Sequence, residues 1–254
     1  MEVNELVQLR RLAYGMLGAM LLYPEESTLA EIADVARHVR HDLAWDSELT
    51  FSVPWDDFVG AVAILTPASV PMLQAEYSGL FDAGAFPKPV PIMESGYLDS
   101  TSLTSGQLLA DLESEYIDAG LAVVTEGAQT ADHAAVELEF VSFLCELEAD
   151  ALESGDMPAI LESTLRQWRF LQQHPCEWIP NFARAVESRG GSEFYTVTTR
   201  TAHALTSHDV DFVEMWSQHL ADHVDGEDAE AGDGLACRKT NQHNQTRKID
   251  PTPA

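Results

Sequence analysis

The sequence predicts an all-α protein in which one helical bundle is followed by a polar tail. Apolar residues recur at three- and four-residue spacing along most of the chain, which is typical of helices packed on a core. No segment has the sustained alternation rich in Val, Ile or Thr that predicts strands. With 254 residues, 45% of them apolar, the chain is long enough for one sizeable core. We expect a single domain of about nine or ten helices over residues 1–222.

The first helix is predicted before Pro24, where Leu6, Leu9, Ala13, Leu17 and Met20 recur at helical spacing. Arg10-Arg11 precede an apolar run and could be mistaken for a twin-arginine export signal. The leading segment is acidic and no A-x-A cleavage site follows the run, so we interpret it as a helix of the folded protein. No stretch reaches the roughly 20 apolar residues of a membrane span, so we expect no stable membrane insertion.

The remaining helices are predicted from their periodicity and from punctuation by Gly, Pro and Ser. Ser27 is expected to cap the second helix, Gly155 and Gly190 to end two later ones, and Ser192 to cap the last. Ser207 and Asp209 predict a break within that last helix. Residues 82–102 are Pro- and Gly-rich but keep aromatic and aliphatic side chains, which favours an ordered loop. The further helices are expected at about 27–39, 54–65, 69–81, 103–120, 132–154, 157–173, 178–189 and 192–220.

From about residue 222 the composition changes. Residues 223–254 are polar, rich in Gly and charge, and almost without large apolar side chains. Such a segment cannot bury enough apolar surface to offset the entropy of ordering, so a disordered tail is expected.

The charge of the chain excludes one class of partner. Asp and Glu number 42 against 14 Lys and Arg, a net charge of −28, which repels phosphate backbones and argues against nucleic acid. The acid could attract a basic partner or reflect salt adaptation of the kind seen in halophiles, and we favour the second. The three cysteines lie far apart with no CxxC pair, which argues against disulfides and a zinc ribbon and fits a reducing cytoplasm.

The helix predicted at 132–154 departs from its own pattern. His133, Glu137 and Glu148 project into its wide apolar face, and a buried carboxylate is costly unless it is paired or protonated. Asp132 can cap this helix, and His133 and Glu137 are close enough to touch. Three interpretations remain open: a structural cap with a buried His–Glu pair, a recognition site for a polar peptide, and a metal or hydrolytic centre. The third lacks any second ligand motif such as HExxH.

Four stretches, in this order, resemble the TorD/DmsD/NarJ family of molybdoenzyme maturation chaperones. They are RLAYGMLGAMLLYPE at 11–25, EYSGLF at 76–81 with the proline loop VPIMESGY at 90–97, ADHAAVELEF at 131–140, and HPCEWIPNF at 174–182 followed by Phe194-Tyr195. Each motif is short, and it is their order and spacing over about residues 4–220 that make the match specific.

The resemblance implies a cytoplasmic all-α chaperone, monomeric or dimeric, that catalyses no reaction and holds no cofactor or metal. It implies two partners: the twin-arginine leader and the immature catalytic subunit of a molybdopterin oxidoreductase. The chaperone would hold this subunit until its cofactor is inserted, and delay its export. Dimethyl sulfoxide, trimethylamine N-oxide and nitrate reductases are all candidate clients.

The resemblance also implies a peptide-binding site. An Asp-His pair, implicated in leader recognition in the family, lies beside a pocket-lining helix end and the proline loop. Ala131 stands where the family usually has Pro, and Gly96 where it often has an apolar residue, so the cap and the loop are expected to be looser here. The matching residues are Asp132, His133, Tyr77, Leu80, Phe81, Pro91, Glu94, Ser95 and Tyr97, and side-chain chemistry adds Glu137 as a partner for a leader arginine.

Core packing is the competing interpretation for Tyr77, Leu80 and Phe81. Two other classes of protein stay possible. One is a metal-dependent hydrolase on a helical bundle, which would need ligands converging from several helices. The other is a structural helical subunit of a complex, which would keep a large apolar patch.

Overall fold

The computed structural model describes residues 3–42, 49–85, 88–98, 104–121 and 129–240. Over these residues the fold is all helical, with nine α-helices and two short 3₁₀ helices, which confirms the predicted fold class. The α-helices are α1 (Val3–Met20), α2 (Glu26–Asp42), α3 (Ser52–Ala63), α4 (Val70–Phe81), α5 (Ser105–Asp118), α6 (Ala134–Ser154), α7 (Met157–Gln173), α8 (Pro175–Arg189) and α9 (Glu193–Thr240), and the 3₁₀ helices are η1 (Pro67–Ser69) and η2 (Glu94–Gly96).

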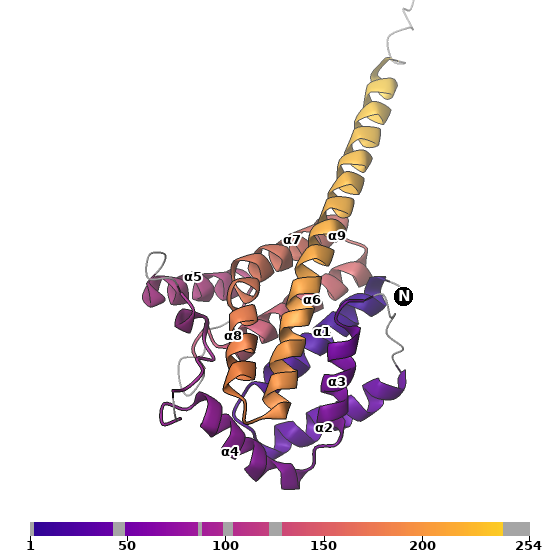
Figure 1. Cartoon of the computed structure of the whole chain (residues 1–254). Coiled ribbons are helices and arrows are strands. Elements are labelled where there is room, and N and C mark those ends of the chain that lie inside the picture. The colour runs from indigo at the N-terminus through magenta and orange to yellow at the C-terminus, as the bar shows by residue number, and fades with distance from the viewer. Residues whose placement is uncertain (1–2, 43–48, 86–87, 99–103, 122–128, 241–254) are drawn as a thin grey trace, which may run out of the picture.

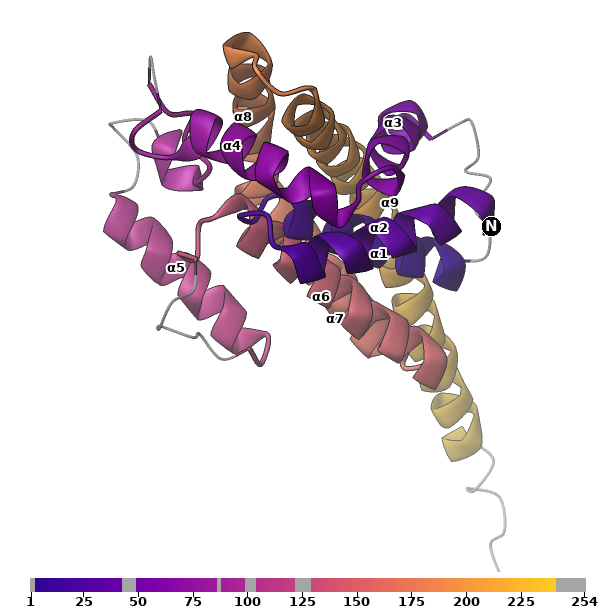
Figure 2. The same ribbon diagram turned by 90° about the horizontal axis from the view of Figure 1, so that it is seen from below.

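The centre of the bundle is α6. It packs on α1 along one side and on α7 along another, and it also contacts α8 (Figures 1 and 2). The approach of α1 is close because Gly18 has no side chain. A Cβ atom there would lie 3.0 Å from the carbonyl oxygen of Ala135. Because α6 is covered on several sides, its apolar face is wide, and polar residues on that face become buried.

Most helix ends follow the predicted punctuation. Gly155 ends α6 with a φ of 69°, a left-handed conformation that favours glycine. Ser192 caps α9, where its Oγ accepts a hydrogen bond of 3.1 Å from the backbone N–H of Tyr195. The predicted cap at Ser27 is wrong. That residue lies inside α2, whose first turn is closed by a bond from Leu29 N–H to the carbonyl of Glu25.

The last helix differs most from its prediction. No break occurs at Ser207 and Asp209, because the Asp209 carboxylate binds a side chain of α1 instead of competing for the backbone of α9. The helix also continues to Thr240, past its predicted end at 220, and projects beyond the bundle (Figure 1). Residues 241–254 lie outside the described residues, and the predicted boundary of the tail at residue 223 stays a prediction.

The described part of the proline loop, residues 88–98, packs on the bundle. Val90 and Ile92 are buried, as expected for an ordered loop. Gly96 does not loosen it: a Cβ at this position would lie 2.3 Å from the Cβ of Pro91, so glycine permits a close turn. Tyr97 closes the same turn by donating a hydrogen bond of 2.8 Å from its hydroxyl to the carbonyl of Pro91.

Over the described ranges, no single helix is both long and apolar enough to cross a membrane. The bent pair Ser52–Ala63 and Pro67–Phe81 meets the length and composition test together.

Candidate functional site: a buried carboxylate cluster at the start of α6

The proline loop is fastened to the N-terminus of α6. Backbone N–H of Glu94 donates to the carbonyl of Asp132 at 2.9 Å, and N–H of Ser95 donates to the Asp132 carboxylate at 3.2 Å. Asp132 therefore holds the loop and does not cap α6, contrary to prediction. The cap is His133, whose Nδ1 accepts a hydrogen bond of 3.1 Å from N–H of Ala135.

Three carboxyl groups converge where this loop meets α6: Glu94 comes from the loop, and Asp132 and Glu137 come from the start of the helix. Glu94, Asp132 and Glu137 are 4%, 1% and 0% exposed. Glu137 accepts a hydrogen bond of 2.9 Å from the indole N–H of Trp178 on α8. Burial, and then the charge of Glu94, raise the pKa of Glu137 well above its ordinary value, so this group keeps its proton where an exposed glutamate has lost it.

Two histidines in the cluster have opposite protonation preferences. Burial alone would lower the pKa of His174, but its hydrogen bonds with Glu115 and Glu94 outweigh burial and raise it to about 9. Its Nδ1 lies 3.0 Å from a Glu94 oxygen, and its Nε2 lies 3.6 Å from Glu115. Burial lowers the pKa of His133 to about 4, opposed only in part by Asp132. At neutral pH His174 is therefore a cation and His133 is neutral.

Two buried atoms of the cluster accept no hydrogen bond from a donor group among the described residues, Nε2 of His133 and Oε1 of Glu137. Glu137, which keeps its proton, shares a side-chain hydrogen bond with the Glu94 carboxylate. The predicted His133–Glu137 pair is therefore not formed. Buried polar atoms without partners are uncommon in folded proteins and are costly, and they concentrate where a structure binds something or rearranges.

An aromatic wall joins this cluster to the end of α4. Tyr97 stacks on Trp178, with ring centroids 5.4 Å apart, and both contact Phe182. The ring centroids of Phe182 and Phe81 are 6.0 Å apart, and those of Phe81 and Tyr77 are 4.9 Å apart. The residues implied by the resemblance thus form two adjacent groups, one polar and one aromatic, with Phe182 between them.

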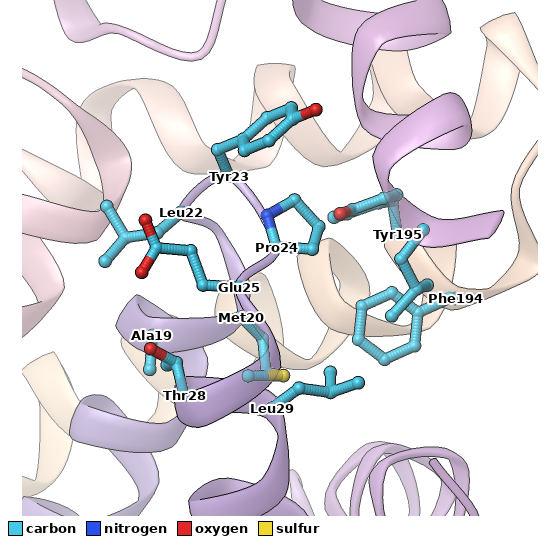
Figure 3. A pocket seen from close by; sticks show the side chains of 11 residues that line it. Ala19, Met20, Leu22, Tyr23, Pro24, Glu25, Thr28, Leu29, Phe194 and Tyr195 are labelled. Carbon is cyan, nitrogen blue, oxygen red and sulfur yellow. The ribbon is translucent and has the colours of Figure 1, made fainter. Parts of the chain in front are cut away.

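The aromatic group belongs mainly to the core. Tyr77 and Leu80 are buried and Phe81 is half-buried, and burial raises the pKa of Tyr77 to about 12. Nearby, Tyr23, Pro24 and Tyr195 line a cavity of about 10 Å³, the volume of a water molecule (Figure 3). The hydroxyl of Tyr195 is buried and has no partner among the described residues. This space is too small for a peptide side chain.

The predicted peptide-binding residues are mostly inaccessible in this conformation. Pro91, Ser95 and Tyr97 are half-buried, while the carboxylates lie beneath them. An incoming arginine can reach Asp132 or Glu94 only if residues 88–98 move away from α6. Whether these residues bind peptide therefore stays a prediction.

A second buried network, which the sequence analysis did not assemble, joins α1 to α9 and α6. The guanidinium of Arg10 donates to both Asp209 oxygens, at 2.6 and 2.9 Å, and to Glu148 at 3.1 Å. Gln167 also accepts from Arg10 and donates to Glu148 at 2.8 Å. The anomalous position of Glu148 in an apolar face was the signal for this network. Its partner in α1 could not be recognised from local pattern.

In the part of the chain that the structure describes, no group of three or more His, Cys, Asp or Glu residues is placed to hold a metal ion.

The chain is similar in sequence to a family of known proteins. The family model described as nitrate reductase delta subunit matches residues 29–184, more than half of the chain. A "Chaperone protein TorD" from Photobacterium profundum is 30% identical over 146 residues, 56% of this chain and 63% of that protein. A second "Chaperone protein TorD", from Shewanella pealeana, is 25% identical over 231 residues, 84% of this chain and 93% of that protein.

Two further relatives extend the comparison. A "Chlorate reductase assembly chaperone protein" from Ideonella dechloratans is 29% identical over 125 residues, 46% of this chain and 58% of that protein. A crystal structure of a putative redox enzyme maturation protein from Archaeoglobus fulgidus aligns with a TM-score of 0.49 and 21% identity, covering 76% of this chain and 91% of that one.

Proposed function

Because this chain belongs to the nitrate reductase delta subunit (NarJ/TorD) family of redox enzyme maturation chaperones, we propose that it binds an immature molybdopterin oxidoreductase before export. Family members are chaperones and not catalysts, so no reaction is assigned to the buried histidines and carboxylates. The partners would be the twin-arginine leader and the catalytic subunit, met in the cytoplasm, and the client would be released once its cofactor is in place.

The observation that carries the leader-binding part of this proposal is the excess of carboxylates at the start of α6. Asp132 and Glu94 lie together with Glu137 and Glu115, and the one cation joined to them by an ion pair, within the described residues, is His174. A guanidinium suits such a place, because it is always charged and can donate two parallel hydrogen bonds to one carboxylate.

Leader binding at this place requires the proline loop to open. Three hydrogen bonds donated by backbone N–H groups join the loop to the α6 entry among the described residues: two between backbone groups, and one from Ser95 to the Asp132 carboxylate. Local opening of such a segment is much less costly than unfolding. We infer that the leader arginine replaces Ser95 at Asp132, while the apolar part of the leader contacts the aromatic side chains around Tyr97 and Phe81.

The test is to recover the tagged full-length protein from its own cytoplasm in high salt and to identify what accompanies it by mass spectrometry. An immature molybdopterin oxidoreductase subunit with its leader attached is the expected result, and it would name the client. A preparation without such a subunit contradicts the proposal. Copurification with another complex at a fixed ratio would instead favour a structural subunit.

The site itself is tested with Asp132→Ala combined with His133→Ala. We expect leader affinity to fall at least tenfold, on the order of the loss when one partner of a buried charge pair is truncated, with helicity unchanged. Glu187→Gln, an exposed substitution on α8, is the matched control. Unchanged affinity in the double variant would return Asp132 and His133 to a purely structural role.

A further inference from the structure

Two open hollows lie beside α1, one towards α2 and one across α6. Figure 2 shows how these three helices are arranged. Between α1 and α2 lies an open hollow of about 540 Å³, lined mainly by Leu12, Gly15, Met16, Ile32 and Val35. Its size is within the roughly 300–1,000 Å³ of typical ligand pockets. Gly15 contributes no side chain to this hollow, so a larger residue there would occupy part of it.

A second hollow, of about 290 Å³, continues the first across α6 towards α5. Val136, Phe143 and Leu121 supply its apolar lining. Both hollows have Arg11 and Ser142 in their walls, so they are adjacent, and we call the two together the groove. In contrast to the carboxylate cluster, this groove is open without any rearrangement of the loop.

The rim of the second hollow carries two carboxylates, whereas Arg11 is the one charged residue that lines the first. Glu139 and Glu146 follow one another at two helical turns on α6, about 10 Å apart at 1.5 Å per residue. Glu139 is exposed and makes no ion pair among the described residues, while Glu146 pairs with Arg11 at 3.1 Å. The side chains of that pair are 45% and 41% exposed, so the pair contributes little to stability and can be exchanged for another cation.

The charges decide which occupant fits. A second copy of this chain would bring another net charge of −28 to an acidic rim, and nucleic acid would be repelled for the same reason. An apolar segment with cationic side chains at one end complements both the lining and the rim.

We propose that this groove is a preformed docking surface for such a segment of the client, distinct from the carboxylate cluster at the start of α6. The apolar side chains of the client would fill the hollow between α1 and α2. Its cations would pair with Glu139 and take Glu146 from Arg11. The inference rests on the proposed function for the identity of the client, and on the groove alone for the chemistry of what binds.

The probe is a fluorescent synthetic peptide with two arginines followed by Leu and Ala residues, and its matched peptide with glutamines in place of the arginines. Anisotropy titrations are made in molar salt, where screening leaves only close charge pairs effective. Gly15→Phe fills the groove from within. Its Cβ has room, because the nearest atom, Ser142 Oγ, lies 3.4 Å from the Cβ position. Gly15→Ala leaves the groove open, and Gly106→Phe places the same bulk on α5 where nothing lies within 4 Å.

We expect Gly15→Phe to lower the affinity for the arginine peptide about tenfold or more, because the apolar side chains of the peptide would no longer be buried in the groove. Gly15→Ala and Gly106→Phe should leave this affinity unchanged. Glu139→Gln with Glu146→Gln should weaken the arginine peptide about fivefold or more, without affecting the glutamine peptide. Equal affinities of the wild type, Gly15→Phe and Gly106→Phe for the arginine peptide would refute the proposal that the peptide binds in the groove. Weakening of the peptide by Asp132→Asn, but not by Gly15→Phe, would place binding at the α6 entry instead.

The two proposals fail in distinguishable ways. If the wild type copurifies with a molybdopterin oxidoreductase but the groove variants bind the peptide normally, the docking proposal is refuted and the proposed function is supported. If the groove variants no longer bind the peptide but no such client is recovered, the docking proposal is supported and the proposed client class is refuted.

Discussion

Removal of the Arg10 guanidinium should destabilise the protein more than almost any other single change. Arg10 is 1% exposed, and its three donor groups meet two buried carboxylates, those of Asp209 and Glu148. In Arg10→Met the apolar stem is largely kept, but the carboxylates lose their cation. Breaking a buried ion pair in this way costs about 3–5 kcal/mol. Since domains are stable by only about 5–15 kcal/mol, this is a large share of the total.

Urea unfolding followed by far-ultraviolet circular dichroism measures this effect. For a chain of this size the slope is near the upper end of its usual range, about 3 kcal/mol per molar urea, so the midpoint should fall by roughly 1–1.7 M. Arg11→Met is the matched control, because its ion pair with Glu146 is exposed and contributes about 0–1 kcal/mol. Its midpoint should move by less than about 0.3 M.

A midpoint for Arg10→Met within about 0.3 M of the wild type would refute the reasoning, because it would mean that the buried charges find other partners or water. A second variant separates charge from packing. When Arg10→Met is combined with Asp209→Leu and Glu148→Met, no charge remains to be compensated. Much of the lost stability should then return, as it does when buried ion pairs are replaced by apolar residues.

Three further predictions concern the carboxylate cluster. The folded state holds the His174 proton up to a pKa of about 9, against about 6.5 when unfolded, so its contribution is complete below pH 6.5 and is lost as the pH rises through 9. Urea midpoints should therefore fall over this window, and His174→Gln should abolish that part of the fall. Asp132→Asn weakens the acceptor for N–H of Ser95, so limited proteolysis should cut the 88–98 loop faster than in Glu187→Gln. Trp178→Phe leaves Glu137 without its donor and should lower stability by about 1–3 kcal/mol, measured by the same urea titration.

The helices were largely predictable because their signals are local. Periodic apolar residues, the glycine after α6 and the serine before α9 act within a turn or two of where they stand. Asp209 shows the limit of such local information. It predicts a helix break, because a free aspartate side chain competes for hydrogen bonds with nearby backbone groups. In the structure its carboxylate instead accepts hydrogen bonds from Arg10, near the other end of the chain.

Sequence and resemblance could list candidate residues for the site but could not give their geometry, and their role in binding stays a prediction. The resemblance selected Asp132, Glu94 and Tyr97, and side-chain chemistry added Glu137, but only the structure brings the proline loop across the start of α6. Asp132 was expected to cap α6, but in the structure it binds the loop at Ser95, and His133 caps the helix. The sequence pattern identifies a polar side chain whose burial on an apolar helix face would cost free energy. It does not show whether that side chain contacts solvent, a loop of the same chain or a partner.

Glu148 shows why the two buried networks have different consequences for function. It was as anomalous in sequence as Glu137, since both place a carboxylate on an apolar face of the same helix. In the fold Glu148 forms an ion pair with Arg10 and accepts a hydrogen bond from Gln167. Glu137, in contrast, keeps a proton that an exposed glutamate would lose, because it is buried beside Glu94. An ion-paired carboxylate already has its cation, whereas a buried acid that holds a proton could release it when a cation enters. Under the proposed function, this difference would favour the start of α6 over the Arg10 network as the place where a client arginine binds.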